Sequence, residues 1–188
     1  MSDDVFFYVD NSNVFHEGQR FAEARKGEDR IKFRLYFKNL MKLAAGGRTV
    51  KEVVWGGSIP PGNDDLWSYL EGLGVKPDLI PRSNSGENET VDHLLQLRMY
   101  RNARKYKNSP GTIVLGTGDG KGYFKEEGFL YDLEGFLESG WKIEVLSWEH
   151  SCHKELRKFA EVNGRFVKLD DYYEKISFVK DGRVVRPV

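Results

Sequence analysis

The chain has 188 residues, which suits one domain with a short extension. Basic and acidic residues balance at 29 each, which excludes a globally basic polyanion binder and requires any nucleic-acid surface to be a local patch. One cysteine excludes an internal disulfide, and the lack of a long apolar segment or signal-peptide pattern indicates a cytoplasmic protein without a membrane partner.

Short apolar runs predict six strands, at residues 5–9, 53–55, 79–80, 112–115, 143–146 and 166–169. Apolar residues at helical spacing predict helices over residues 31–45, 66–73, 91–106, 126–137 and 153–162. Strands that alternate with helices indicate an α/β fold with three layers, in which helices cover both faces of a mostly parallel central sheet. The turn signal Asp181-Gly182 predicts a small C-terminal β-hairpin over residues 176–188, attached to a main domain of residues 1–175.

Polar residues follow two of the predicted strands. Asp10 ends the first strand and is followed by Asn11, Ser12 and Asn13, whereas Asp119 lies in the glycine-rich segment 116–122 after the fourth strand. Ligands of open parallel sheets bind beyond the carboxyl ends of the strands, so Asp10 and Asp119 converge if these two strands are neighbours. Asp92, near the start of the helix after the third strand, is a third acidic candidate.

Three converging carboxylates repel one another unless a cation neutralises them. Mg²⁺ binds to a few carboxylates, several waters and the phosphate oxygens of a substrate, so the expected chemistry is metal-assisted hydrolysis of a phosphodiester. Asn11, Ser12 and Asn13 are candidates for orienting waters or a carboxylate, and the glycines around Asp119 would allow a phosphate backbone to approach. The competing interpretation is local: Asp10 caps the following helix, and Asp92 is a first-turn acid stabilised by a helix dipole.

Arginines continue along the helix that carries Asp92. Arg98, Arg101 and Arg104 are spaced by three and therefore share one helix face. We consider two interpretations, a ridge that contacts phosphates of a nucleic acid and a solvated helix surface with cations near its C-terminal end.

Four segments, in chain order, resemble the NYN domain family of the PIN-like nuclease superfamily. The matching segments are Val9-Asp10-Asn11-Ser12-Asn13, Thr90-Val91-Asp92, Leu115-Gly116-Thr117-Gly118-Asp119-Gly120, and Trp148-Glu149-His150-Ser151 with the residues up to Leu169. The resemblance covers about residues 5 to 173 and implies that the first strand lies centrally beside the fourth. It also implies cleavage of RNA that depends on Mg²⁺ or Mn²⁺, with Asp10, Asp92 and Asp119 as metal ligands and Asn13 as a supporting catalytic residue.

The chain departs from the family pattern at two positions, where Arg98 and Lys121 replace aspartates. Either cation could contact an RNA phosphate as a fixed charge, and Asn11 and Ser12 are also expected to contact RNA. The presence of the two cations favours one bound metal ion over two.

The main hypothesis is therefore a metal-dependent ribonuclease that acts on single-stranded or structured RNA. The alternative is a catalytically weak or inactive RNA-binding or adaptor module, and a homodimer or a protein partner stays open. A phosphatase of the HAD type is disfavoured, because Ser12 stands where its second aspartate is needed.

Overall fold

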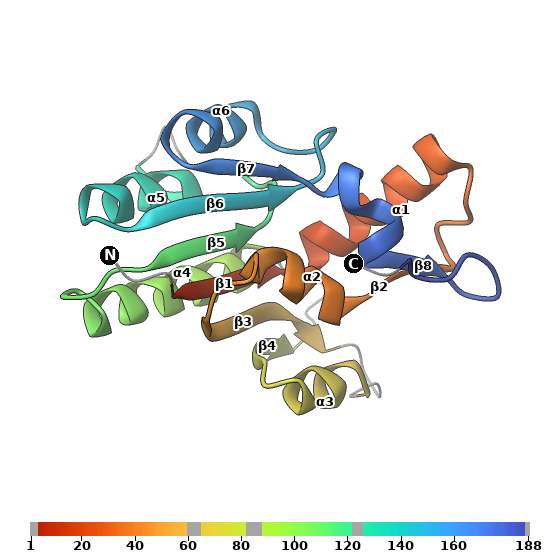
Figure 1. Cartoon of the computed structure of the whole chain (residues 1–188), viewed down its shortest axis with the longest axis horizontal. Coiled ribbons are helices and arrows are strands. Elements are labelled where there is room, and N and C mark those ends of the chain that lie inside the picture. Colours follow the sequence, from red (N-terminus) through yellow and green to blue (C-terminus); the bar gives the residue numbers. More distant parts are fainter. Residues whose placement is uncertain (1–3, 60–64, 82–87, 122–125, 187–188) are drawn as a thin grey trace.

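The computed structural model describes residues 4–59, 65–81, 88–121 and 126–186, and a six-stranded sheet lies at its centre (Figure 1). The strands of this sheet are β1 (Val5–Asp10), β3 (Val50–Ile59), β4 (Lys76–Pro81), β5 (Thr112–Gly116), β6 (Lys142–Ser147) and β7 (Arg165–Lys168). The six strands that the sequence predicts are all present; the first five are longer in the structure by one or more residues, and the sixth is shifted by one residue. The α/β fold class is confirmed.

The order of the strands is β4-β3-β1-β5-β6-β7, and every neighbouring pair is parallel. The chain begins in the middle of the sheet, builds outward to β4, crosses back to β5 and then builds outward on the other side. The order thus reverses between β1 and β5, which confirms that the first and fourth predicted strands are neighbours. In open parallel sheets this reversal point is where ligands bind, beyond the carboxyl ends of the strands.

Helices cover both faces of the sheet (Figure 1). One face packs against α4 (Asn88–Lys105), α5 (Gly128–Glu138) and α6 (Lys154–Asn163). The other face packs against α1 (Asn11–Lys26), α2 (Phe37–Ala45), α3 (Asp65–Gly72) and the short α7 (Tyr173–Ile176), which follows the 3₁₀ turn Leu169–Tyr172.

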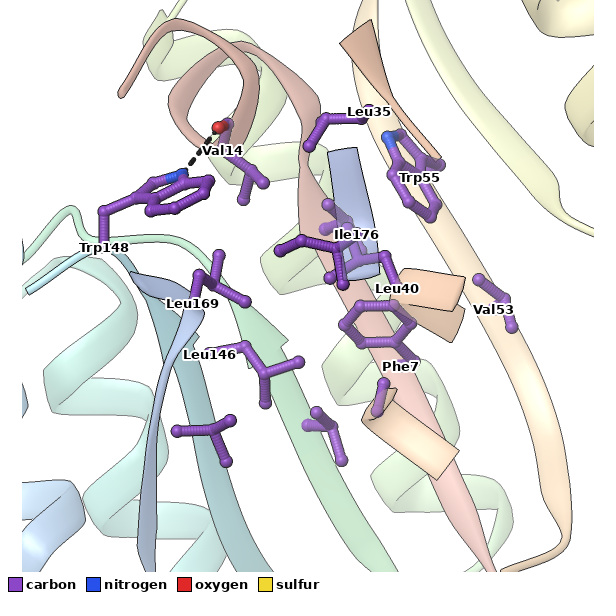
Figure 2. Packing of buried hydrophobic residues seen from close by; sticks show 14 of the residues in the cluster. Phe7, Val14, Leu35, Leu40, Val53, Trp55, Leu146, Trp148, Leu169 and Ile176 are labelled. Atoms are coloured by element: carbon purple, nitrogen blue, oxygen red, sulfur yellow. Dashed lines mark hydrogen bonds between the residues drawn. The ribbon is translucent and has the colours of Figure 1, made fainter. Parts of the chain in front are cut away.

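The central strand β1 is buried throughout, as expected for a parallel strand with helices on both sides. Its side chains alternate between the two cores: Phe6 and Tyr8 belong to one cluster, and Phe7 and Val9 to the other. Figure 2 shows the second cluster, in which Phe7 lies close to Leu40 of α2. At its edge, the indole N–H of Trp148 donates to the backbone oxygen of Val14 over 2.8 Å and so links the end of β6 to α1 (Figure 2).

The structure corrects the sequence-based elements in one part of the chain. Helix α1 is absent from the predicted helices, and the single helix expected over residues 31–45 is a strand, β2 (Phe33–Leu35), followed by α2. Helix α1 lacks a continuous apolar stripe because a glycine, Gly18, occupies one of its buried positions. A Cβ atom there would lie 2.6 Å from Phe33 Cζ, so the close packing of α1 on β2 requires glycine.

The small antiparallel sheet near the C-terminus is present, but its strands differ from the expected hairpin. Strand β8 (Ser177–Val179) forms the sheet with β2, and its backbone bond across the turn runs from the Val179 N–H to Arg183 O over 2.9 Å. Residues 187–188 of the expected hairpin lie outside the described residues. The turn itself forms as predicted: Asp181 adopts a positive φ of 57°, and the Gly182 N–H donates to Val179 O over 3.0 Å. Among the described residues, no helix is long and apolar enough to cross a membrane.

Candidate functional site

Asp10 ends β1 and also caps α1, so the local and functional interpretations of this residue are compatible. The Asn13 N–H donates to Asp10 Oδ1 over 3.1 Å, which is the bond expected of a helix cap. The residue is nonetheless only 8% exposed, and its pKa is raised to about 6, mainly by burial. The charge of Asp119 contributes to this increase, whereas the backbone N–H groups of Asn13 and Ser12 oppose it.

The loop after β5 brings Asp119 to the same place. Thr117, a buried residue of this loop, donates its hydroxyl to Asp10 Oδ2 at 3.5 Å and accepts the Asp119 N–H at 3.2 Å. The Thr117 hydroxyl therefore joins the Asp10 carboxylate to the backbone of Asp119, at the reversal point between β1 and β5. Thr117 was not among the residues that the sequence singled out, although it lies between two of the glycines that were.

Asn13 connects helix α1 to this loop. Its side-chain oxygen accepts the Gly118 N–H over 2.8 Å, a bond between residues 105 positions apart. Asn13 thus lies beside the acidic pair, as expected for a supporting residue. Its side chain holds the loop in position, and its backbone N–H caps Asp10.

Asn11 and Ser12, both expected to contact RNA, are partly buried at the start of α1. The side-chain oxygen of Asn11 accepts the indole N–H of the buried Trp55 over 3.0 Å, so this oxygen already has a role inside the protein. The backbone N–H of Ser12 bonds to Asp10. Both residues help to fix the acidic site, and their contact with RNA stays a prediction.

Asp92 lies in the first turns of α4, and its Oδ1 atom is buried. The helix begins at the same edge of the sheet, since Val91 packs so closely on Gly56 that a Cβ atom there would lie 2.8 Å from Val91 Cγ1. Gly56 is the register partner of Asp10. However, within residues 4–59, 65–81, 88–121 and 126–186, no three His, Cys, Asp or Glu side chains come together to hold a metal ion. The structure pairs Asp10 with Asp119 and does not close a cage of three carboxylates with Asp92.

Lys121 contacts Asp119 through both its backbone and its side chain. Its N–H donates to Asp119 Oδ1 over 2.9 Å, and its Nζ lies 3.8 Å from Asp119 Oδ2. The lysine side chain is 82% exposed, so this ion pair is weak and open to competition from another cation.

The glycines of the loop have a packing role that the sequence did not reveal. A Cβ atom on Gly118 would lie 2.7 Å from Ser147 Oγ, and one on Gly120 would lie 2.6 Å from His153 Cβ. The backbone of the loop is therefore pressed against the end of β6 and the start of α6, where the His153 N–H donates to Gly118 O over 2.9 Å. This packing explains both glycines without a bound phosphate, and Gly122 lies outside the described residues.

The arginine ridge leads away from the acidic pair. Val91 packs at the carboxyl end of the sheet, whereas Tyr106 packs on Phe6 near the start of β1, with 4.9 Å between ring centroids, so α4 runs antiparallel to the strands. With a rise of about 1.5 Å per residue, Arg101 and Arg104 lie about 14 and 18 Å along the helix axis from Asp92. Both are exposed, whereas Arg98, about 9 Å along the axis, is partly buried.

No protein-family model matches the chain, and no curated protein matches it. A solved structure of a protein of unknown function from Vibrio parahaemolyticus is similar, with a TM-score of 0.63, 18% sequence identity, and coverage of 90% of this chain and 94% of the other. At that identity the likeness shows the fold alone. The α/β fold is therefore shown, and the chemistry at the edge between β1 and β5 is argued from the residues themselves.

Proposed function

We propose that this protein is a metal-dependent ribonuclease that hydrolyses RNA phosphodiester bonds at the site formed by Asp10 and Asp119. The observation that carries the proposal is that Asp10 and Asp119 come together at the reversal point of a parallel sheet. The Thr117 hydroxyl bonds to the Asp10 carboxylate and to the Asp119 backbone N–H, and the charge of Asp119 contributes to the raised pKa of Asp10. A buried carboxylate beside a second one is unfavourable in the ionised form, and a bound divalent cation removes that cost.

The donor set suits a single hard cation. Mg²⁺ and Mn²⁺ accept carboxylate oxygens together with several waters and substrate phosphate oxygens, so two or three carboxylates are sufficient. Asp10 and Asp119 would hold the ion, with Asp92 at the same edge as a third candidate ligand. When bound, the metal would activate a water and stabilise the negative charge that develops on the phosphate.

The protein's own residues position these groups. Asn13 fixes the loop that carries Asp119, and the Asn13 N–H fixes one oxygen of Asp10, so the two carboxylates are held before any substrate arrives. The exposed Lys121 is free to swing from Asp119 towards a phosphate oxygen. The choice of RNA as substrate is supported by the four motifs that resemble the NYN family.

The direct test is cleavage of single-stranded and structured RNA by the purified chain with Mg²⁺ or Mn²⁺. We expect cleavage that a chelator stops and that Asp119→Asn abolishes while the circular dichroism spectrum is unchanged. The matched control is Asp171→Asn, an exposed aspartate in the 3₁₀ turn, which should leave the rate unchanged. No cleavage of varied RNAs with either metal would refute the proposal.

A second candidate function, an RNA-binding or adaptor module without catalysis, is favoured by the Lys121 contact with Asp119 and by the two-carboxylate site. This function predicts RNA affinity that falls with salt and needs no metal. Isothermal titration calorimetry distinguishes the two, since only the ribonuclease requires Mg²⁺ or Mn²⁺ to bind near neutral pH.

A further inference from the structure

An aromatic pocket of about 570 Å³ lies next to the acidic site. Five rings line it: Phe15, Tyr36, Phe37, Tyr69 and Phe178. They come from α1, the start of α2, α3 and β8, all at the end of the sheet to which the strands point (Figure 1). This volume is in the range of sites that bind small molecules or single groups of a larger ligand.

Asn11 connects the pocket to the acidic site. It lines the pocket and directly follows Asp10 in the chain. Its side chain holds the indole of Trp55, which packs edge-on against Phe37 with 5.2 Å between ring centroids. Phe37 in turn lies 6.5 Å from the ring of Tyr69, so a row of three aromatic rings leads from the neighbour of Asp10 to the protein surface.

The pocket also contains a positioned cation. Arg34 lines it, and its Nη1 atom donates to the backbone oxygens of Ile31 and Phe33, each over 2.7 Å. These bonds hold one side of a guanidinium group that remains positively charged and suited to an anionic ligand. Aromatic walls with one fixed cation match a nucleotide, which has a flat aromatic base and a negatively charged phosphate.

One aromatic wall is accessible to such a base. Tyr69 is 45% exposed, although it packs near Phe37, and an exposed tyrosine ring gains most when a flat ligand covers it. A base in a duplex is stacked and paired on both sides, so only an unpaired base could enter a pocket lined by side chains from five segments.

We propose that this pocket takes one unpaired nucleobase of single-stranded RNA, from the nucleotide next to the phosphate that a metal ion at Asp10 and Asp119 would hold. The inference rests on the proposed ribonuclease function and adds the substrate class, single-stranded RNA, and the residues that select it. Tyr69 and Phe37 form the stacking wall, and Arg34 neutralises the adjoining phosphate.

The test measures binding without cleavage. A short fluorescein-labelled single-stranded RNA is titrated with the full chain in the presence of a chelator, and the fluorescence anisotropy gives the dissociation constant. Tyr69→Ala should weaken binding roughly fivefold to hundredfold, and Tyr69→Phe should retain it because the stacking ring remains. The matched control is Tyr131→Ala on α5, whose ring is 41% exposed outside the pocket and which should bind like the native chain. A blunt duplex of the same sequence should bind more weakly and should be insensitive to Tyr69→Ala.

A second readout detects stacking itself. With 2-aminopurine at one position of the RNA, the fluorescence should fall on binding to the native chain and to Tyr69→Phe, but not on binding to Tyr69→Ala. Equal dissociation constants for the native chain, Tyr69→Ala and Tyr131→Ala would overturn the proposal. So would displacement of an apolar dye from the pocket by a hydrophobic peptide but not by the RNA.

These outcomes separate the pocket from the ribonuclease proposal. Cleavage that depends on Asp119 while binding does not depend on Tyr69 would refute the pocket proposal alone. Binding that depends on Tyr69 in a protein that never cleaves RNA would support the pocket proposal and refute the ribonuclease proposal.

Discussion

Two carboxyl groups in this protein are almost equally buried but differ in their neighbours. Asp10, at the reversal point of the sheet, and Asp132, on α5, are 8% and 6% exposed, and burial is the main reason that the pKa of each is raised. Asp132 accepts hydrogen bonds from Gln96 Nε2 at 2.6 Å and Tyr100 Oη at 2.8 Å, both on α4. Asp10 also accepts hydrogen bonds, from the Asn13 N–H and the Thr117 hydroxyl, but it lies near a second acid, Asp119, whose charge helps to raise its pKa.

The difference indicates which acid is structural. The neutral donors around Asp132 satisfy its oxygens and join α4 to α5, so nothing further is needed there. Hydrogen-bond donors alone do not resolve the site of Asp10, because the charge of Asp119 disfavours ionisation of Asp10. A raised pKa alone therefore does not mark a functional site, whereas a raised pKa beside a like charge, at the reversal point of a parallel sheet, makes Asp10 the stronger candidate.

The largest expected effect separates the two acids by activity. Asp10→Asn should lower the rate of RNA cleavage by at least about a hundredfold, because loss of metal-based stabilisation amounts to several kcal/mol of the barrier. Asp132→Asn should stay within about threefold of the native rate, since Asp132 lies outside the acidic site. Initial rates of cleavage of one single-stranded RNA with Mn²⁺ measure the effect of each variant. Equal losses of rate in the two variants would mean that both substitutions act by destabilising the fold rather than on the chemistry.

The second prediction concerns stability without metal. The pKa of Asp10 is raised from an ordinary 3.8 to about 6, so the folded state binds this proton more tightly than the unfolded state. The free energy of unfolding should fall as pH rises between these values, by about 3 kcal/mol. Asp10→Asn keeps the oxygen that caps α1 and removes the charge, so at neutral pH it should be more stable by roughly 2–3 kcal/mol.

Urea unfolding in the presence of a chelator, at neutral and at acid pH, measures the free energy of unfolding of the native chain and of Asp10→Asn. The higher stability of Asp10→Asn should disappear at about pH 4, where Asp10 of the native chain is also protonated. The exposed Asp171→Asn should change stability by less than about 0.5 kcal/mol at either pH. An unchanged or lower stability of Asp10→Asn at neutral pH would show that Asp10 is not strained in the ionised state.

Much of the fold could be predicted from the sequence because buried parallel strands appear as short apolar runs. The strand β2 could not, because residues 33–35 form a strand only by pairing with β8, more than 140 positions later. Helix α1 was missed for a related reason, since Gly18 interrupts its apolar pattern to fit Phe33.

The acidic pair was predictable for a simple geometric reason: parallel strands bring their carboxyl ends to one edge. Its supporting contacts were not predictable, because the bonds from Gly118 to Asn13 and from Trp55 to Asn11 join distant parts of the chain. Asn11 and Asn13 were chosen for their polarity, and the structure shows which groups they hold. The glycines of the loop, read as space for a phosphate, are needed for packing on Ser147 and His153.

The third prediction sharpens the comparison with a metal. At about ten times its dissociation constant, Mn²⁺ should stabilise the native chain by about 1.4 kcal/mol, which raises the melting temperature by roughly 3–6 °C. The increase should be smaller at pH 5 than at pH 7.5, because protonated Asp10 is a poor ligand. Differential scanning fluorimetry should show the increase in Asp132→Asn and not in Asp10→Asn. An equal increase in both variants would place the metal elsewhere.

The smallest expected effect concerns Lys121, which competes with a metal for Asp119. Because this lysine is exposed, Lys121→Gln should tighten Mn²⁺ binding only about twofold to fivefold, and the gain should shrink as salt is added.

If Lys121 also contacts a phosphate, the same variant should bind RNA more weakly, and the dependence of log K on log salt should fall by about one. Lys107→Gln, an exposed lysine after α4, is the matched control for charge. If Lys121→Gln binds Mn²⁺ more tightly and RNA more weakly, Lys121 has both roles. It can pair with Asp119 in the free protein, and it can contact the phosphate once a metal ion has taken its place at Asp119. A loss of metal affinity would instead show that Lys121 holds Asp119 in its binding position.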